Sequence, residues 1–353
     1  MATLSPFHSS WAHTMRLSVF ILLLALAPSL HAAELPEITA SVSEDGITFL
    51  AGSQIITKYH TAKSVAKPYF FPLNAPNGTG ITRPWPMVKG SVPGETTDHV
   101  HQKSMWFCHG DIIPEGIELK VRSADKHVQG VDFWSEGVGH GKMVCTEIGK
   151  PKAISKTHVS VPTKNDWRTA DGTTILTEDR TIHVQATKTG YLILLDINLH
   201  ASVCPITFGD TKEGSMGVRV HDALRTSQKD GGTVSSSNGE VLKAPIKDNL
   251  AVWGKPANWH DYSGKIGEKT AGVAIFDFEN NPLKSLWHTR AYGLMAANPF
   301  GREKSGFPGA KGKTELVKLK KGENLKLRYG VFVHDGDAKA GEVAAVYESV
   351  NSK

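Results

Sequence analysis

The sequence predicts a mostly β protein, a large antiparallel β-sandwich with a short helix near its C-terminus. From residue 38 onward, short stretches rich in β-branched and aromatic residues are separated by Gly, Pro, Asn and Asp, a pattern typical of strands and turns. Helical periodicity is scarce. With 353 residues, 40% of them hydrophobic and 21% charged, the chain can bury a large core. Long antiparallel sheets of this size usually stack face to face.

The N-terminus, residues 1–32, predicts a secretory signal peptide. A basic residue precedes the apolar run Leu17–Ala27, and small residues then lead to an expected cleavage after Ala32. Since the signal-like segment starts at Met15, residues 1–14 are interpreted as an upstream start-site extension. The apolar run is shorter than the roughly 20 residues that span a bilayer. We therefore expect an exported protein, periplasmic or extracellular, with no membrane span in the mature chain.

The rest of the chain, residues 33–353, is expected to form a single β-sandwich domain, because no internal repeat or low-complexity linker divides it. Within Tyr191–His200, two sets of residues alternate with the period of a strand. The predicted strands are Ile47–Leu50, Gln54–Tyr59, Gly116–Val121, Thr173–Ala186, Tyr191–His200, Gly217–Asp222, Gly272–Phe278 and Asn324–Val333.

One segment, Lys339–Ser349, has the pattern of an amphipathic helix. Val343, Val346 and Tyr347 fall on roughly one face, and Asp337 is placed to cap the N-terminus. We expect this helix to pack against the sheet.

Charge and cysteine content exclude several classes of protein. The net charge is +5, but Lys and Arg are spread along the chain among Asp and Glu, whereas a nucleic-acid surface would concentrate them. The spacing of Cys108, Cys145 and Cys204 matches neither a zinc motif nor a redox pair. We expect these cysteines to be buried, with room for one disulfide among them.

The segment Thr97–Asp111, T-D-H-V-H-Q-K-S-M-W-F-C-H-G-D, concentrates functional side chains in a predicted strand region. If it is extended, His99 and His101 share one face and Val100 is buried on the other. Paired imidazoles suit proton transfer or hydroxyl binding. They could also chelate a metal together with His109, although no further ligand is evident, so no cofactor is expected.

Two other segments supply charged groups. Glu213 stands in a glycine-punctuated turn directly before a strand, and Arg219 follows on that strand on the same face as His221. Upstream, Arg83 and Trp85 lie in a proline-rich loop and supply a positive charge and a stacking surface.

The remaining two segments are a glycine-rich loop around His140 and a polar stripe formed by His288, Arg290 and Tyr292. A polar stripe on a sheet face is costly unless it lines a cavity. Asn298 lies in a turn that could bring it to the same place.

Imidazoles, carboxylates, arginines and aromatic rings together suit a polyhydroxylated ligand, with carbohydrate the natural candidate partner. We expect a secreted enzyme that uses His/Glu general acid–base chemistry on a sugar or sugar derivative, as a hydrolase, lyase or epimerase. Two alternatives stay open, a non-catalytic carbohydrate-binding module and a metal-dependent oxidative enzyme. The predicted catalytic residues are His99, His101, Glu213 and His288. The predicted substrate-binding residues are Arg83, Trp106, His109, Arg219, Tyr292 and Asn298.

The ordered motifs D-H-V-H-Q-K-S-M-W-F-C-H-G-D, V-D-F-W, F-G-D-T-K-E-G-S-M-G-V-R-V, W-H-T-R-A-Y-G and N-P-F-G resemble a family of exported bacterial proteins. That family, of planctomycete-type genomes, is labelled methane oxygenase PmoA or domain of unknown function. The resemblance extends from about Tyr59 to Val350, and the motif around Glu213 is its most specific part. The label implies copper and oxygen chemistry.

A weaker similarity, in fold and residue types, is to the galactose-mutarotase-like β-supersandwich. It implies a sugar substrate, with His99 or His101 as the acid and Glu213 as the base.

Overall fold

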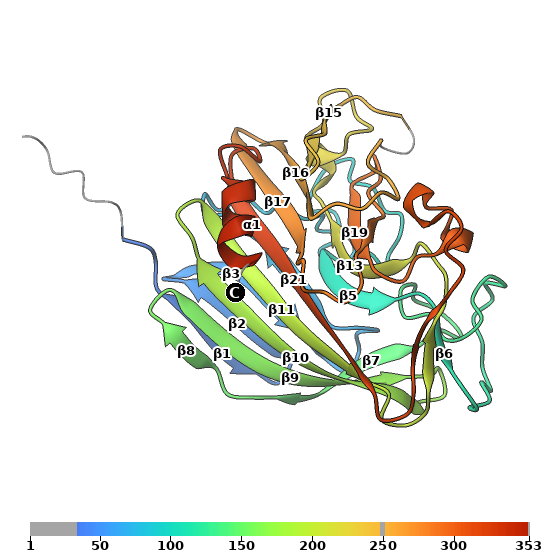
Figure 1. Cartoon of the computed structure of the whole chain (residues 1–353). Coiled ribbons are helices and arrows are strands. Elements are labelled where there is room, and N and C mark those ends of the chain that lie inside the picture. Colours follow the sequence, from blue (N-terminus) through green and yellow to red (C-terminus); the bar gives the residue numbers. More distant parts are fainter. Residues whose placement is uncertain (1–33, 248–250, 352–353) are drawn as a thin grey trace, which may run out of the picture. The chain divides into compact units, whose positions relative to one another are not determined.

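The computed structural model describes residues 34–247 and 251–351, and the predicted signal peptide lies outside this part of the chain. Two large antiparallel sheets form the body of residues 35–351 (Figure 1). In the described part, the first sheet has eight strands. In spatial order they are β1 (Ile38–Ser43), β2 (Gly46–Ala51), β3 (Gln54–His60), β4 (Tyr69–Leu73), β5 (Met105–His109), β13 (Gly214–Arg219), β19 (Leu294–Asn298) and β18 (Leu286–Trp287).

The second sheet contains ten strands within the described residues, and β8 pairs only with β9 at its edge. The strands are β15 (Val241–Lys243), β14 (Thr233–Ser236), β16 (Trp259–Ile266), β17 (Lys269–Asp277), β21 (Asn324–Asp335), β11 (Gly190–His200), β10 (Thr174–Ala186), β9 (His158–Arg168), β7 (Lys142–Ile148) and β8 (Lys152–Ser155). A small third sheet is formed by β20 (Val317–Leu319), β12 (Ile206–Phe208) and β6 (Ile112–Pro114).

The alternation predicted for Tyr191–His200 is confirmed in β11. Ile193 and Leu195 belong to the main core cluster, whereas Leu192 and Leu194 face the other side of the sheet. That other side is covered by the C-terminal helix α1 (Val343–Asn351) (Figure 1). Tyr347 of this helix belongs to the same hydrophobic cluster as Leu192 and Leu194. The predicted helix therefore exists and packs on the sheet.

The helix begins four residues later than predicted. Asp337 accepts hydrogen bonds from the backbone N–H groups of Lys339 and Ala340 and so caps the turn before the helix. Glu342 then has φ of 55°, a left-handed conformation, and α1 starts at the next residue.

Two of the predicted strands were wrong or only partly right. Residues 116–121 form no strand, because Gly116 turns the chain at φ of 78° directly after β6. The strand predicted at Gly217–Asp222 starts earlier, at Gly214, and ends at Arg219, and the short 3-10 helix η1 (Asp222–Leu224) follows.

The most important correction concerns residues 99–101, which form a turn before β5 instead of a strand. The backbone N–H of Gln102 donates to the carbonyl of His99 at 2.9 Å. The guanidinium of Arg83 binds the carbonyls of Asp98 and His99, so these groups are not free to pair with a strand. Val100 consequently lies at the surface with 45% of its area exposed, contrary to its predicted burial.

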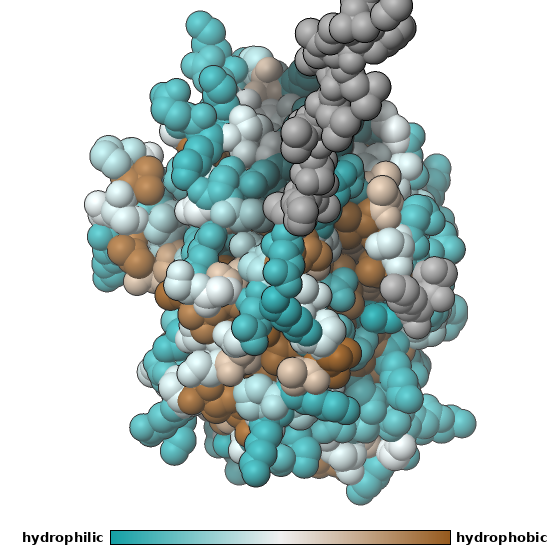
Figure 2. Space-filling model, turned by 90° about the vertical axis from the view of Figure 1, so that its left-hand side faces the viewer, coloured by the Kyte–Doolittle hydropathy of each residue, from teal (hydrophilic) through white to brown (hydrophobic). Residues whose placement is uncertain are grey.

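All three cysteines are free, and Cys145 is only half-buried, while Cys108 and Cys204 are buried as expected. Within residues 34–247 and 251–351, no helix combines the length and apolar character needed to cross a bilayer. Figure 2 shows hydrophilic residues interspersed with small apolar groups on one face of the molecule.

Candidate functional site

A cavity of about 620 Å3 is built from side chains of several separate chain segments. These are the turn at 99–102, a loop at 125–135, the turn at 210–213, Tyr292, and residues 304–305 in the short 3-10 helix η2 (Glu303–Ser305). The turn at 99–102 precedes β5 and the turn at 210–213 precedes β13. Because these strands are antiparallel, with His109 opposite Gly214, the two turns enter from opposite ends of the strand pair.

The turn at 99–102 brings the two predicted imidazoles together by a different route from the one expected. The rings of His99 and His101 are 5.7 Å apart between centroids, with their planes at 74°. Both side chains line the cavity. The residues were therefore predicted correctly as neighbours, although the backbone that holds them is a turn.

Glu213 lines the cavity from the turn before β13, as the sequence indicated. Its backbone carbonyl accepts a hydrogen bond from Gly110 N–H at 2.7 Å. The amide of Asn298 donates to the carbonyl of Thr211 at 2.9 Å and holds the turn from its other side. Asn298 itself is buried and supports the Glu213 turn without lining the cavity.

The carboxylate of Glu213 receives no hydrogen bond from the residues described here, although Thr211 binds its backbone N–H. Burial raises the pKa of Glu213 to about 7, while the cation of Lys212 opposes this change. Near neutral pH this side chain is present in both protonation states. It can therefore donate or accept a proton under physiological conditions.

His101 is held in the neutral state. Burial, together with the nearby cation of Lys67, lowers the pKa of His101 to about 3. Lys67 is itself buried, where it donates to the carbonyl of Trp134 at 2.7 Å and pairs with Glu136 at 3.2 Å. A neutral imidazole offers one N–H donor and one acceptor to a ligand.

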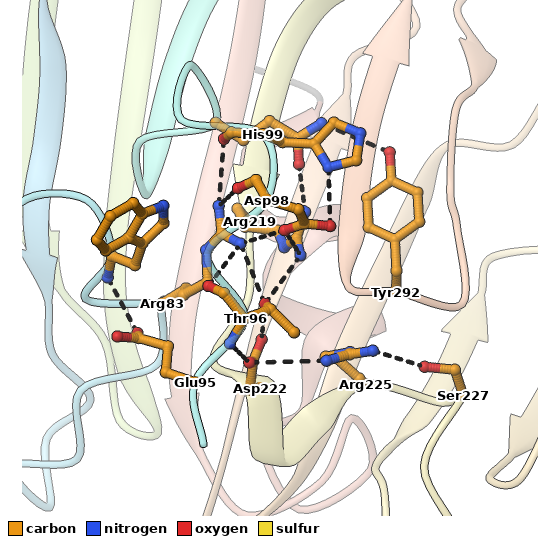
Figure 3. Close-up of polar contacts among 12 residues, drawn as sticks. Arg83, Glu95, Thr96, Asp98, His99, Arg219, Asp222, Arg225, Ser227 and Tyr292 are labelled. Carbon is orange, nitrogen blue, oxygen red and sulfur yellow. Dashed lines mark hydrogen bonds and ion pairs between the residues drawn. The ribbon is translucent and has the colours of Figure 1, made fainter. Parts of the chain in front are cut away.

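Beside the cavity, two buried arginines converge on one carboxylate (Figure 3). Arg83 and Arg219 bind the same oxygen of Asp98 at 2.5 and 2.9 Å. The other oxygen of Asp98 faces Nδ1 of His99 at 2.9 Å. Arg83 and Arg219, which the sequence suggested as ligand contacts, are fully buried and act on the cavity through Asp98.

Tyr292 forms part of the cavity wall and stacks on His99, with ring centroids 5.1 Å apart and planes at 8°. The guanidinium of Arg219 lies 4.7 Å from the Tyr292 ring centroid. Gln102 joins these groups, because its side chain accepts from Arg219 at 2.6 Å and donates to the Tyr292 hydroxyl at 3.5 Å. His99 is thus fixed by a ring on its face and a carboxylate at its edge.

Three further predicted site residues lie in the protein interior and do not line the cavity. His288 is buried, both its ring nitrogens lack a hydrogen-bond partner among the described residues, and burial lowers its pKa to about 3. His109 contacts the carbonyl of Gly209 at 2.9 Å, just before the Glu213 turn. Trp106 packs edge-on against Trp134, which does line the cavity.

Sequence reasoning missed several acidic residues whose main partners are backbone N–H groups. Asp210 accepts from the N–H groups of Arg302, Lys304 and Ser305 and so joins the Glu213 turn to η2. Asp132, in the glycine-rich loop, accepts from two N–H groups in the same way. The position of Asp210 in the glycine-punctuated motif F-G-D-T-K-E-G is the one sequence feature that could have indicated its role.

No group of three or more His, Cys, Asp or Glu side chains within the described ranges is placed to hold a metal ion. His99, His101 and His109 therefore do not form the metal set that the sequence offered as an alternative. The oxidative chemistry implied by the methane-oxygenase label stays a prediction, since the described residues include no such group of metal ligands.

Fold and cavity together define an antiparallel β-sandwich protein with a polar cavity beside one sheet. The chain belongs to the family of unknown function DUF6807, whose model matches residues 46–348. This agrees with the domain-of-unknown-function part of the sequence resemblance.

Several solved structures are distantly similar. One is the galactosidase domain of an alpha-galactosidase-sucrose kinase, with 9% identity and a TM-score of 0.40 over 86% of this chain. This chain covers 41% of that protein's length. A galactose mutarotase related enzyme from Lactobacillus acidophilus has 9% identity and a TM-score of 0.32, with 85% and 98% of the two chains covered. A galactose mutarotase-like protein from Lactobacillus casei has 11% identity and a TM-score of 0.28, with 84% and 100% covered. None of the curated proteins has a sequence that matches this chain.

Proposed function

We propose that this protein is an enzyme that acts on a sugar or sugar derivative by general acid–base catalysis. The observation that carries the proposal is the meeting of Glu213, whose pKa is about 7, with His99 and His101 in one cavity. A catalytic acid or base works best when its pKa lies near the working pH. Burial of a carboxyl group is a common way in which proteins reach that condition.

The cavity also suits a polyhydroxylated ligand of small size. Its volume of about 620 Å3 lies within the roughly 300–1,000 Å3 of small-molecule sites. The ring of Tyr292, which is not fully buried, can contact the C–H face of a sugar, and Ser135 adds a hydrogen-bonding group.

The arrangement of the groups fits a two-sided reaction. Glu213 enters at one end of the β5–β13 pair and the histidines at the other, so a ligand can lie between them. One group would remove a proton from the substrate while the other donates one. Hydrolysis, β-elimination and epimerisation all need this pair of functions.

The proposal is tested by turnover of a panel of neutral oligosaccharides and uronic-acid-containing sugars. Glu213→Gln and His101→Gln should each lower kcat/KM at least about 10²-fold. The wild-type pH profile should show an inflection near pH 7 from the Glu213 titration, and Glu213→Gln should lack it. Glu118→Gln, at an exposed position outside the cavity, is the matched control. Full activity in both cavity variants would exclude the proposed roles.

A non-catalytic carbohydrate-binding module is the second candidate, favoured by the aromatic wall that Tyr292 provides. It predicts that calorimetry detects sugar binding that is lost in Tyr292→Ala, with no turnover of any member of the panel. We further propose that the protein works outside the cytoplasm, in the periplasm or the medium, on the strength of its N-terminal sequence.

A further inference from the structure

Asp98 precedes His99, which lines the cavity, and its carboxylate has an unusual set of partners. Its side chain is 44% exposed, yet two arginines with fully buried side chains both bind its Oδ1 atom. Thr96 adds contacts to the same two guanidinium groups, and Asp222 anchors Thr96 (Figure 3). These contacts fix the position of the segment 96–99.

Burying two guanidinium groups side by side is costly, because each loses its hydration and they repel each other. The cost shows in Arg219, where burial and the proximity of Arg83 lower the pKa to about 10. The Nε atoms of both arginines lack a hydrogen-bond partner among the described residues.

The charge of Asp98 is secured by this arrangement. Burial alone would raise its pKa, but Arg219, His99 and Arg83 outweigh burial and lower the pKa of Asp98 to about 2. Near neutral pH Asp98 is therefore a carboxylate, and only an acceptor of hydrogen bonds.

The two oxygens of this carboxylate have different partners. Oδ1 accepts from both arginines, which leaves Oδ2 for Nδ1 of His99 at 2.9 Å. Since Oδ2 can only accept, Nδ1 of His99 must carry a hydrogen. The neutral ring then has its lone pair on Nε2, and the side chain that carries this atom lines the cavity.

We propose that Asp98 is a positioning residue that holds His99 in the tautomer with a free Nε2, so that His99 accepts the substrate proton and Glu213 donates one. This role rests on the proposed function. It reverses the assignment implied by the mutarotase resemblance, in which the histidine is the acid and Glu213 the base. The stacked ring of Tyr292 keeps the imidazole plane fixed while Asp98 fixes its hydrogen.

The variant Asp98→Asn gives a sharp test because it replaces the acceptor that faces Nδ1 of His99 at 2.9 Å by a donor, without changing the size of the side chain. The arginines can only donate, so the amide oxygen stays with them and the amide NH2 faces His99. Nδ1 must then accept, and the hydrogen moves to Nε2. With a turned-over sugar from the panel, kcat should fall at least about 10²-fold while KM changes little.

The tautomer is read directly by 15N NMR of protein labelled in its histidines. The measurement is made at about pH 9, above the range in which imidazoles normally titrate. The His99 signals are those that disappear in His99→Gln. Wild type should show a protonated Nδ1, and Asp98→Asn a protonated Nε2. The control Asp222→Asn changes another acid of the same cluster, one that binds Thr96 and not His99, and should leave the tautomer unchanged.

A protonated Nε2 in wild type would overturn the proposal, and so would an unchanged tautomer in folded Asp98→Asn. A thermal denaturation curve will show whether Asp98→Asn folds. If it does not fold, the tautomer of His99 in the wild-type protein is the test of the proposal. The NMR result needs no substrate. Absence of turnover by wild type would therefore remove the proposed function while leaving the tautomer control by Asp98 separately established or refuted.

Discussion

At the scale of single residues, Gly110 sets how closely the end of β5 approaches the turn that carries Glu213. A Cβ atom at this position would lie 2.8 Å from the Glu213 backbone oxygen and 2.9 Å from its Cβ. The backbone of Glu213 cannot move away without breaking the 2.7 Å hydrogen bond from Gly110 N–H. Gly110 therefore fixes the position of the proposed acid from the neighbouring strand.

We expect Gly110→Ala to lower the free energy of unfolding by about 1–3 kcal/mol, because the added methyl group overpacks a fixed contact. Chemical denaturation measures this change. Gly80→Ala is the control, since its Cβ would meet only the Asn74 side chain at 3.6 Å, and it should stay within about 0.5 kcal/mol of wild type. Equal stability of the two variants would contradict the close contact at Gly110.

Single residues of the cavity were predicted with mixed success, for a physical reason. His99, His101, Glu213 and Tyr292 were found because polar and aromatic side chains gather where a sheet would be apolar. The same composition marks Trp106 and His109, which are buried, because composition does not say which side of the backbone faces a cavity. The role of Asp98 was not predicted, because it depends on contacts with Arg83 and Arg219, which lie elsewhere in the sequence.

At the scale of elements, the sequence pattern predicted regular strands, but it did not predict turns that are held by groups distant in the chain. The alternation in β11 predicted both of its faces, including the one under α1. The turn at 99–101 contains the same alternation of side chains as a strand. Its geometry is set by hydrogen bonds from Arg83, which local periodicity cannot reveal.

A buried ion pair joins the strands β16 and β21 beneath the segment that leads to α1. Nε2 of His334 lies 2.8 Å from a carboxylate oxygen of Asp261, and both side chains are fully buried. Burial opposes protonation of His334, but the charge of Asp261 outweighs it and raises the pKa of His334. Gly272 and Gly341 leave room for this ring, since a Cβ on either would collide with it.

The pair should make stability depend on pH in a defined direction. Because the folded pKa of His334 is raised, its contribution is complete below about pH 6.5 and is lost as the pH rises through the folded pKa. His334→Gln should cost about 3–5 kcal/mol at pH 5.5, and the difference from wild type should shrink at higher pH. Denaturation curves across this range provide the measurement.

The matched control is His183→Gln, which removes a partly exposed imidazole 3.2 Å from Asp196 on the same sheet. Its effect should stay below about 1 kcal/mol, because water screens the pair. A pH-independent difference between wild type and His334→Gln would show that His334 is not charged in the folded protein.

At the scale of the whole molecule, residues 1–32 are predicted to be a signal peptide and lie outside the described residues. We expect protein recovered from the periplasm or medium of expressing cells to begin at Ala33, as intact-mass measurement will show. Leu23→Arg interrupts the apolar run and should keep the chain uncleaved in the cytoplasm. Cleavage of this variant at the same bond would contradict the prediction.

The two-sheet architecture followed from the amount of β pattern in a chain of this length. The order of strands did not, because β11 pairs with β21 and β5 with β13 across more than a hundred intervening residues. Hydrophobic periodicity places a strand in a sheet but does not name its neighbour. The cavity depends on those neighbours, which is why its residues could be suggested singly but not assembled.

The dispersed origin of the cavity has a consequence for how the protein acquires its chemistry. Segments from 99–102 to 304–305 must all be in place before the cavity is closed. Chains dominated by such distant contacts fold slowly, because long loops must close, at a cost in entropy, before the stabilising contacts can form. A partly folded or truncated chain would carry its histidines and carboxylates without bringing them together. The proposed tautomer of His99 depends on contacts of Asp98 with Arg83 and Arg219, so it would serve as an internal marker that these separate segments have come together.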